Sequence, residues 1–73
     1  MPRLGVFSGT AICDLLVGHG FVNVRQRGSH VVMQKRLDGS TITVPVPLHR
    51  EVCIGTLRSI IRQSGLPRRI FET

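Results

Sequence analysis

The sequence predicts an α+β fold in which two helices cover one face of a three-stranded antiparallel sheet. Two segments with helical spacing of apolar residues flank a central stretch in which apolar and polar residues alternate. An Asp38-Gly39 pair divides that stretch, and this dipeptide favours a tight hairpin. We expect residues 1–73 to form one domain, because a chain of this length buries only about 60% of its unfolded surface. Function should therefore lie on a face or in a shallow groove.

The first helix is expected to begin after Ser8 or Thr10, both good N-cap residues, and to run to about His19. Gly20 is the expected left-handed stop. One apolar face is formed by residues at i, i+3 and i+4, namely Ile12, Leu15 and Leu16.

Three strands follow, joined by turns at Gly28-Ser29 and Asp38-Gly39. The strands are expected over residues 21–27, 30–37 and 41–46. The Asp38-Gly39 turn is predicted to be type I′, in which both central residues have positive φ. Pro45 has no N–H to donate to a sheet, so the third strand should be an edge strand.

The second helix is expected over residues 57–64, with Thr56 as its N-cap and Gly65 as its stop. Residues 67–73 are expected to add one more turn, because Pro67 suits a first helical position. The buried stripe of the second helix comprises Leu57, Ile60, Ile61 and Ser64. The predicted order is therefore α-β-β-β-α.

Strand alternation divides the sheet into two faces. The face covered by the helices is expected to carry Val22, Val24, Val31, Met33, Ile42, Val44 and Val46. The other face is expected to carry Asn23, Arg25, Arg27, His30, Val32, Gln34, Arg36, Thr41 and Thr43. This basic, polar face around one imidazole is a candidate phosphate site, although antiparallel sheets commonly show water a polar face.

The charge balance indicates a polyanionic partner. The net charge is +6, and nine of the ten basic residues are Arg, whose planar guanidinium binds phosphate in a bidentate way. A basic surface that only keeps the protein dissolved is the alternative. Three Phe and no Trp or Tyr argue against a platform of aromatic rings for base stacking.

Other classes of function have little support in the sequence. Cys13 and Cys53 lie far apart with no CxxC pattern, so we expect two reduced, mostly packed thiols and no metal site. No apolar run approaches the roughly 18 residues of a membrane span, and no signal-peptide pattern is present. We therefore expect a cytoplasmic protein with no membrane contact.

An ordered set of motifs resembles the HicA toxins, the mRNA interferases of HicA–HicB toxin–antitoxin pairs. The motifs are Gly20-Phe21, Arg25-Gln26-Arg27-Gly28-Ser29-His30, Val44-Pro45, His49, and the segment from Gly55 to Leu66. The chain departs from the family pattern at Val31, where some members carry a second His, and in its more basic tail, residues 66–71.

The resemblance implies a double-stranded-RNA-binding-domain-like fold, which agrees with the predicted order of elements. It implies an endoribonuclease that cleaves mRNA, needs no cofactor, and is neutralised by a HicB-type antitoxin protein. It also assigns the catalytic role to His30, which begins the strand after the Gly-Ser turn.

RNA cleavage by this route needs a proton-transfer group and a cation, because the substrate supplies its own 2′-hydroxyl nucleophile. Imidazole exchanges protons near neutral pH, which suits His30 to the first role. His49 is either a second acid–base group or a residue that only fixes its loop. The candidates for binding RNA are Arg25, Arg27, Ser29, Lys35 and Arg36.

Four further arginines are expected to contact RNA or the antitoxin, or else to form a solvated surface: Arg58, Arg62, Arg68 and Arg69. The main alternative function is a non-catalytic double-stranded-RNA-binding module. That class usually carries a Lys cluster at the start of its second helix, whereas this chain has no Lys there. A domain that only binds an acidic protein is the second alternative.

Overall fold

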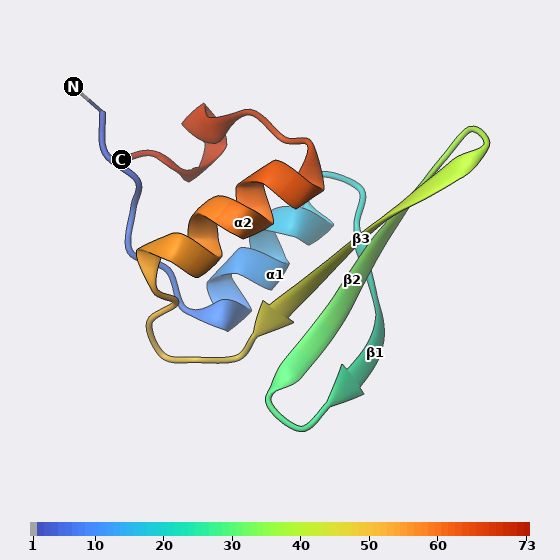
Figure 1. Cartoon of the computed structure of the whole chain (residues 1–73), viewed down its shortest axis with the longest axis horizontal. Helices are drawn as coiled ribbons and strands as arrows, with labels where there is room; N and C mark the ends of the chain where they lie inside the picture. The colour runs from blue at the N-terminus through green and yellow to red at the C-terminus, as the bar shows by residue number, and fades with distance from the viewer. Residues whose placement is uncertain (1) are drawn as a thin grey trace.

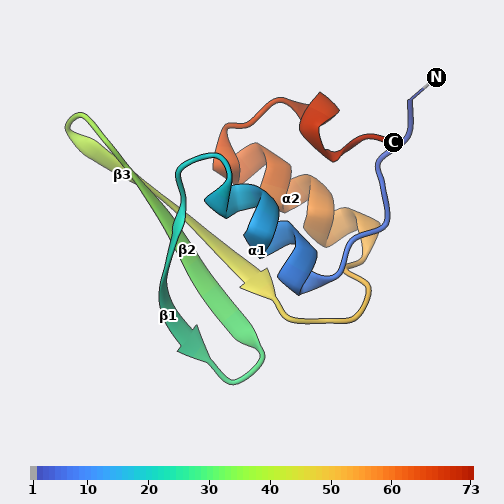
Figure 2. The same cartoon turned by 180° about the vertical axis from the view of Figure 1, so that it is seen from behind.

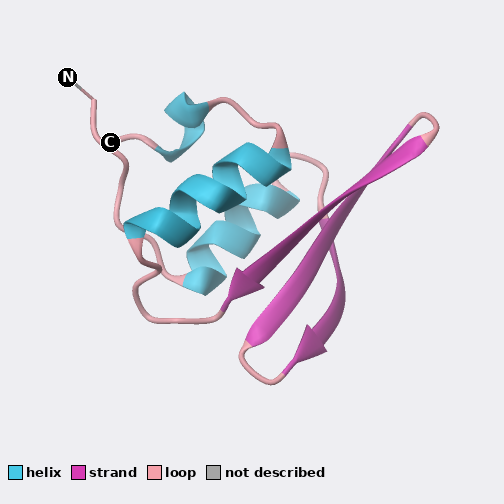
Figure 3. Ribbon diagram, in the orientation of Figure 1, coloured by secondary structure: helices cyan, strands magenta, loops and turns pink. Residues whose placement is uncertain are grey.

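The predicted order of elements is confirmed by a computed structural model of the chain, which describes residues 2–73 (Figures 1 and 3). The elements are α1 (Gly9–Val17), β1 (Val22–Arg27), β2 (His30–Leu37), β3 (Ser40–Pro47), α2 (Ile54–Ser64) and a 3-10 helix, η1 (Arg68–Phe71). The two helices lie side by side against one face of the sheet (Figures 1 and 2).

Helix α1 begins where its first turn is capped. The Ser8 hydroxyl accepts a hydrogen bond from the Ala11 N–H at 3.0 Å, so Ser8 rather than Thr10 is the N-cap. Ile12 and Leu16 are fully buried, as their spacing predicts. The chain leaves the helix through Gly20, whose φ of +95° is a conformation that favours glycine.

Helix α2 begins earlier than predicted, at Ile54, with Cys53 rather than Thr56 as the N-cap residue. The Leu57 N–H donates to the Cys53 carbonyl at 2.9 Å, which closes the first turn. The far end agrees with the prediction, because Gly65 has a left-handed φ of +71°. Pro67 precedes η1 instead of occupying its first position.

The sheet has the order β1-β2-β3, so β3 is an edge strand as Pro45 predicts. Strands β2 and β3 pair without interruption from His30↔Pro47 to Leu37↔Ser40. The predicted type I′ turn is wrong: among the described residues only glycines have positive φ, so Gly39 adopts it and Asp38 does not.

Strand β1 departs from the predicted alternation. A bulge between Asn23 and Arg25 shifts its register against β2. Val22 and Val24, expected beneath the helices, are instead 60% and 51% exposed. Asn23 pairs with the buried Met33 and so belongs to the helix-covered side, opposite to the prediction. The open face of the sheet is therefore partly apolar.

The core lies between the two helices and β2–β3, and it agrees with the predicted faces of those two strands. Every element except β1 contributes to it. Its buried apolar residues are Ile12, Leu16, Phe21, Val31, Met33, Val44, Val46, Val52, Leu57, Ile60 and Phe71. Among residues 2–73 the one buried polar side chain is that of Ser64, and its hydroxyl is satisfied because it donates to the Ile61 carbonyl and accepts from the Leu66 N–H.

Gly9 marks the closest approach between α1 and the chain that follows β3. A Cβ at this position would overlap the Pro47 carbonyl oxygen and lie 2.7 Å from the Cα of Leu48. The Gly9 N–H also donates to the His49 carbonyl at 2.9 Å. The absence of a side chain at Gly9 thus brings the helix into direct contact with residues 47–49.

We predict that Gly9→Ala lowers the free energy of unfolding by about 3 kcal/mol, because backbone atoms must move to admit the methyl group. Gly55→Ala is the matched control, since nothing lies within 4 Å of its Cβ position. That variant should gain roughly 0.5–1 kcal/mol from helix propensity. Urea unfolding measures both, and equal effects of the two substitutions would contradict the assigned contact.

Candidate active site

One groove collects both histidines that the family resemblance singled out. It has a volume of about 320 Å³ and lies between the β2–β3 end of the sheet and α2. The residues that line it are His30, Pro45, Pro47, His49, Thr56, Ser59, Ile60 and Gln63. The groove is shallow and open, as expected of so small a domain.

His30 is held at the start of β2 by a tight turn. Gly28 takes a φ of +55°, which lets the chain reverse within two residues. His30 then pairs with Arg27 of β1 on one side and with Pro47 of β3 on the other. The Leu48 N–H donates to the Ser29 carbonyl, so the turn is also tied to the loop after β3. The exposed imidazole therefore stands on a fixed backbone.

His49 lies on the loop between β3 and α2, and two backbone contacts hold that loop. The His49 carbonyl accepts from the Gly9 N–H, and the Val52 N–H donates to the Phe7 carbonyl at 2.8 Å. Val52 is buried in the core. The backbone of His49 is anchored while its side chain faces the groove.

Helix α2 supplies three polar groups that the sequence analysis did not single out for the groove: Thr56, Ser59 and Gln63. Their spacing of three and four residues puts them on one helix side. The apolar stripe beginning at Leu57 runs beside them, so a search for polar residues at i, i+3 and i+7 next to that stripe would have found them.

The predicted RNA-binding residues are not all brought together. Arg27 lies directly opposite His30 on the open face. Ser29 is exposed in the turn next to it. Arg25 lies further along β1 and lines a second hollow with Val24, Val32 and Gln34.

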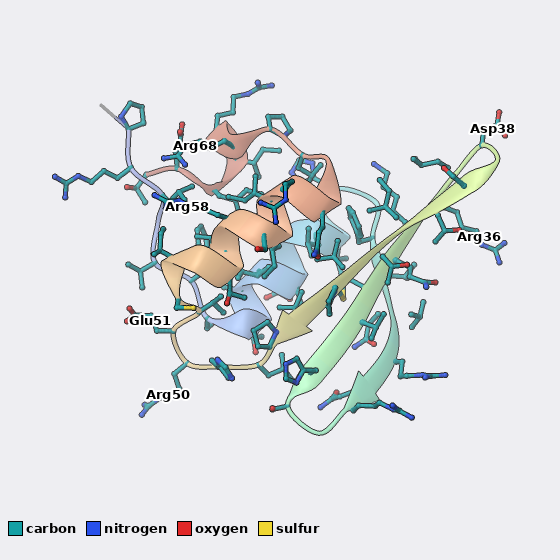
Figure 4. All side chains as sticks on the ribbon, viewed as in Figure 1. Arg36, Asp38, Arg50, Glu51, Arg58 and Arg68 are labelled. Carbon is teal, nitrogen blue, oxygen red and sulfur yellow. The ribbon has the colours of Figure 1, made fainter. Side chains whose placement is uncertain are left out.

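The other two predicted RNA-binding residues, Lys35 and Arg36, lie away from His30. Arg36 is six residues along β2, roughly 20 Å away at the far end of the hairpin (Figure 4). Lys35 is on the helix-covered side, with its Nζ 5.9 Å from the centre of the Phe21 ring. Neither cation can serve a phosphate held by His30.

The four arginines predicted to contact RNA or the antitoxin do not lie together either. Arg62 donates from Nη to the Ser59 hydroxyl at 3.4 Å, at the rim of the groove. Arg58 and Arg68 line a different hollow on another side of α2. Arg69 is exposed and lines neither.

The two cysteines differ in their surroundings. Cys13 is partly buried, and burial followed by the charge of Asp14 raises the pKa of its thiol. Cys53 is exposed, which corrects the expectation that both thiols are packed. Its Sγ lies 3.1 Å from the Thr56 hydroxyl. Hydrogen bonds from that hydroxyl and then from the backbone of Thr56 lower the pKa of the Cys53 thiol.

We predict that a limiting amount of iodoacetamide at neutral pH alkylates Cys53 before Cys13, because a lower pKa leaves more thiolate. Thr56→Val, which keeps the shape but removes the hydroxyl, should slow the alkylation of Cys53 and leave that of Cys13 unchanged. Peptide mass spectrometry measures both sites. An unchanged Cys53 rate in Thr56→Val would contradict the role given to the hydroxyl.

Residues 2–73 contain no helix that is long and apolar enough to cross a membrane. The same residues contain no group of three or more His, Cys, Asp or Glu placed to bind a metal ion.

The fold is a double-stranded-RNA-binding-domain-like α+β fold with α-β-β-β-α topology. It carries a histidine-lined groove beside a basic strand. Residues 9–66, most of the chain, match the family model described as the HicA toxin of bacterial toxin–antitoxin systems. The chain therefore belongs to the HicA toxin family. No curated protein matches it.

Proposed function

We propose that this HicA toxin is an endoribonuclease that cleaves mRNA without a metal ion. The observation that carries the proposal is that His30 and His49, far apart in the sequence, line one groove. Two imidazoles can divide the two proton transfers of RNA cleavage between them. The family supports RNA as the substrate, and the net charge of +6 favours a polyanion.

In the proposed reaction one imidazole takes the proton of the 2′-hydroxyl. The 2′ oxygen then bonds to the neighbouring phosphorus while the bond from phosphorus to the 5′ oxygen breaks. The second acid–base group protonates the leaving 5′ oxygen. The products are a 2′,3′-cyclic phosphate and a 5′-hydroxyl, so no water is consumed in this step.

The other groove residues, together with Arg27 on the neighbouring strand β1, have binding roles in this proposal. Arg27, opposite His30 in the strand register, stabilises the charge that develops on the phosphorane. Thr56, Ser59 and Gln63 offer hydrogen bonds to ribose or base on the α2 side. The Pro45 and Pro47 rings form the apolar floor on the strand side.

We predict that His30→Ala reduces cleavage of total mRNA by about 10²–10⁴-fold, the usual cost of losing a general acid–base group. His19→Ala is the matched control and should cleave at the wild-type rate, because His19 does not line the groove. Gel analysis in EDTA, with circular dichroism on each variant, measures the effect.

Equal cleavage by wild type and His30→Ala would remove His30 from the chemistry. Intact RNA with wild type, combined with salt-sensitive binding, would favour the non-catalytic RNA-binding module instead. His49→Ala separates the two roles left open for that residue. A loss of rate with unchanged stability assigns it to proton transfer, whereas a loss of stability assigns it to the loop.

We also propose that a HicB-type antitoxin neutralises the toxin by covering the groove and the adjoining open face of the sheet. Family membership supports the partner. The exposed Val22 and Val24 beside Arg25 suit an acidic protein surface with apolar contacts. Cleavage that continues in a stoichiometric complex with that antitoxin would count against this placement.

A further inference from the structure

A second basic site lies on another side of α2, apart from the histidine groove. Three arginines from three separate parts of the chain line one hollow of about 280 Å³. Arg3 comes from the N-terminal segment, Arg58 from α2 and Arg68 from η1. Figure 4 shows Arg58 and Arg68 next to each other over the first half of α2. Pro2, Leu4 and Ile54 form its apolar walls.

The backbone around this hollow is held in place by the pairing of the two ends of the described chain. The Gly5 N–H donates to the Phe71 carbonyl at 2.7 Å, and the Thr73 N–H donates to the Arg3 carbonyl at 2.9 Å. Leu4 and Glu72 form an antiparallel bridge between the same segments. Phe71 is fully buried and packs edge-on against Phe7. Arg3 and Arg68 are therefore presented by anchored segments.

The charges of the hollow leave room for an anion. Arg68 donates from Nε to the Glu72 carboxylate at 2.8 Å, the one ion pair within residues 2–73. That contact uses Nε and leaves the Nη groups of Arg68 for a second anion. Arg3 and Arg58 make no ion pair among the described residues. Like charges that converge in this way repel one another until an anion binds between them.

Helix α2 connects this hollow to the groove. At about 100° per residue, Ile54 and Arg58 lie on nearly the opposite side of the helix from Thr56 and Gln63. Arg62 lies between them on the exposed side, and its guanidinium reaches Ser59 at the groove rim. A line of positive charge thus crosses the outer surface of α2 from the groove through Arg62 to Arg58.

We propose that the hollow formed by Arg3, Arg58 and Arg68 binds a backbone phosphate of the same RNA strand whose scissile bond lies in the groove. This inference rests on the proposed function. Guanidinium groups bind phosphate oxygens in a bidentate way, and a single RNA strand carries such phosphates at regular spacing. A helix with its side chains is about 10–12 Å across, so the path over α2 needs at least about four nucleotides.

A long RNA should therefore reach both the groove and the hollow, whereas a short RNA should occupy only the groove. Binding is measured with the His30→Ala chain, so that cleavage does not interfere, using labelled single-stranded RNAs of roughly three and roughly twelve nucleotides. Two double variants are compared. The first carries Arg58→Ala and Arg68→Ala, and the second, the control, carries Arg36→Ala and Arg69→Ala. Each pair removes two arginines, and the second pair lies outside both the groove and the hollow.

We expect the Arg58/Arg68 pair to weaken binding of the long RNA by about tenfold and to lower its salt slope by about one unit, with the short RNA unaffected. The control pair should change binding of the long RNA no more than about threefold. Arg58→Lys with Arg68→Lys should restore part of the affinity, because charge remains while the bidentate fork is lost.

Equal weakening of the long RNA by both pairs would overturn the proposal. So would unchanged RNA binding with a weakened antitoxin complex, since the hollow would then be a protein contact. Wild-type cleavage reports on the proposed function separately. If wild type cleaves RNA but the two double variants bind the long RNA equally well, only the phosphate site is rejected. If the long RNA binds through Arg58 and Arg68 but wild type does not cleave it, only the nuclease activity is rejected.

Discussion

The close packing of Gly9 against Pro47 and Leu48 is the contact on which the groove depends. Helix α1 reaches the end of β3 only because no side chain stands between them. The same approach lets the Gly9 N–H bind the His49 carbonyl, while the neighbouring Leu48 N–H binds the Ser29 carbonyl. Both histidine-bearing segments are therefore fixed by one junction of helix, turn and loop. The geometry of the groove is coupled in this way to the packing of the first helix.

Helix α2 serves three surfaces at once. Leu57, Ile60 and Ser64 face the core, and the side with Thr56, Ser59 and Gln63 faces the groove. Arg58 faces the basic hollow. A helix of only three turns can do this because the core needs just one stripe of its surface. The same short helix therefore presents polar side chains to the groove and a cation to the basic hollow.

The sequence predicted most of the fold but only part of the site. The alternation of apolar and polar residues correctly predicted the two faces of β2 and β3, since both strands lie over the core and pair without a bulge. It failed for Val22 and Val24, because a bulge in a strand outside the core leaves no local signal in the sequence. His30 could be found from the motif around it. The spacing of Thr56, Ser59 and Gln63 marks them as one polar side of α2, but only the packing of α2 against β3 shows that this side faces the groove. The contact of Lys35 with Phe21, which turns this cation away from His30, also leaves no signal in the sequence.

The prolines of β3 have a consequence for how other chains can approach. Pro45 and Pro47 alternate along an edge strand and carry no N–H, so this edge lacks the regularly spaced donors that an incoming strand would need. Sheet extension between copies of the chain is therefore disfavoured beside the histidines. The open edge of β1 keeps its donors. Backbone chemistry thus protects the histidine side of this basic chain, with its exposed valines, from strand addition, and access there depends on side chains alone.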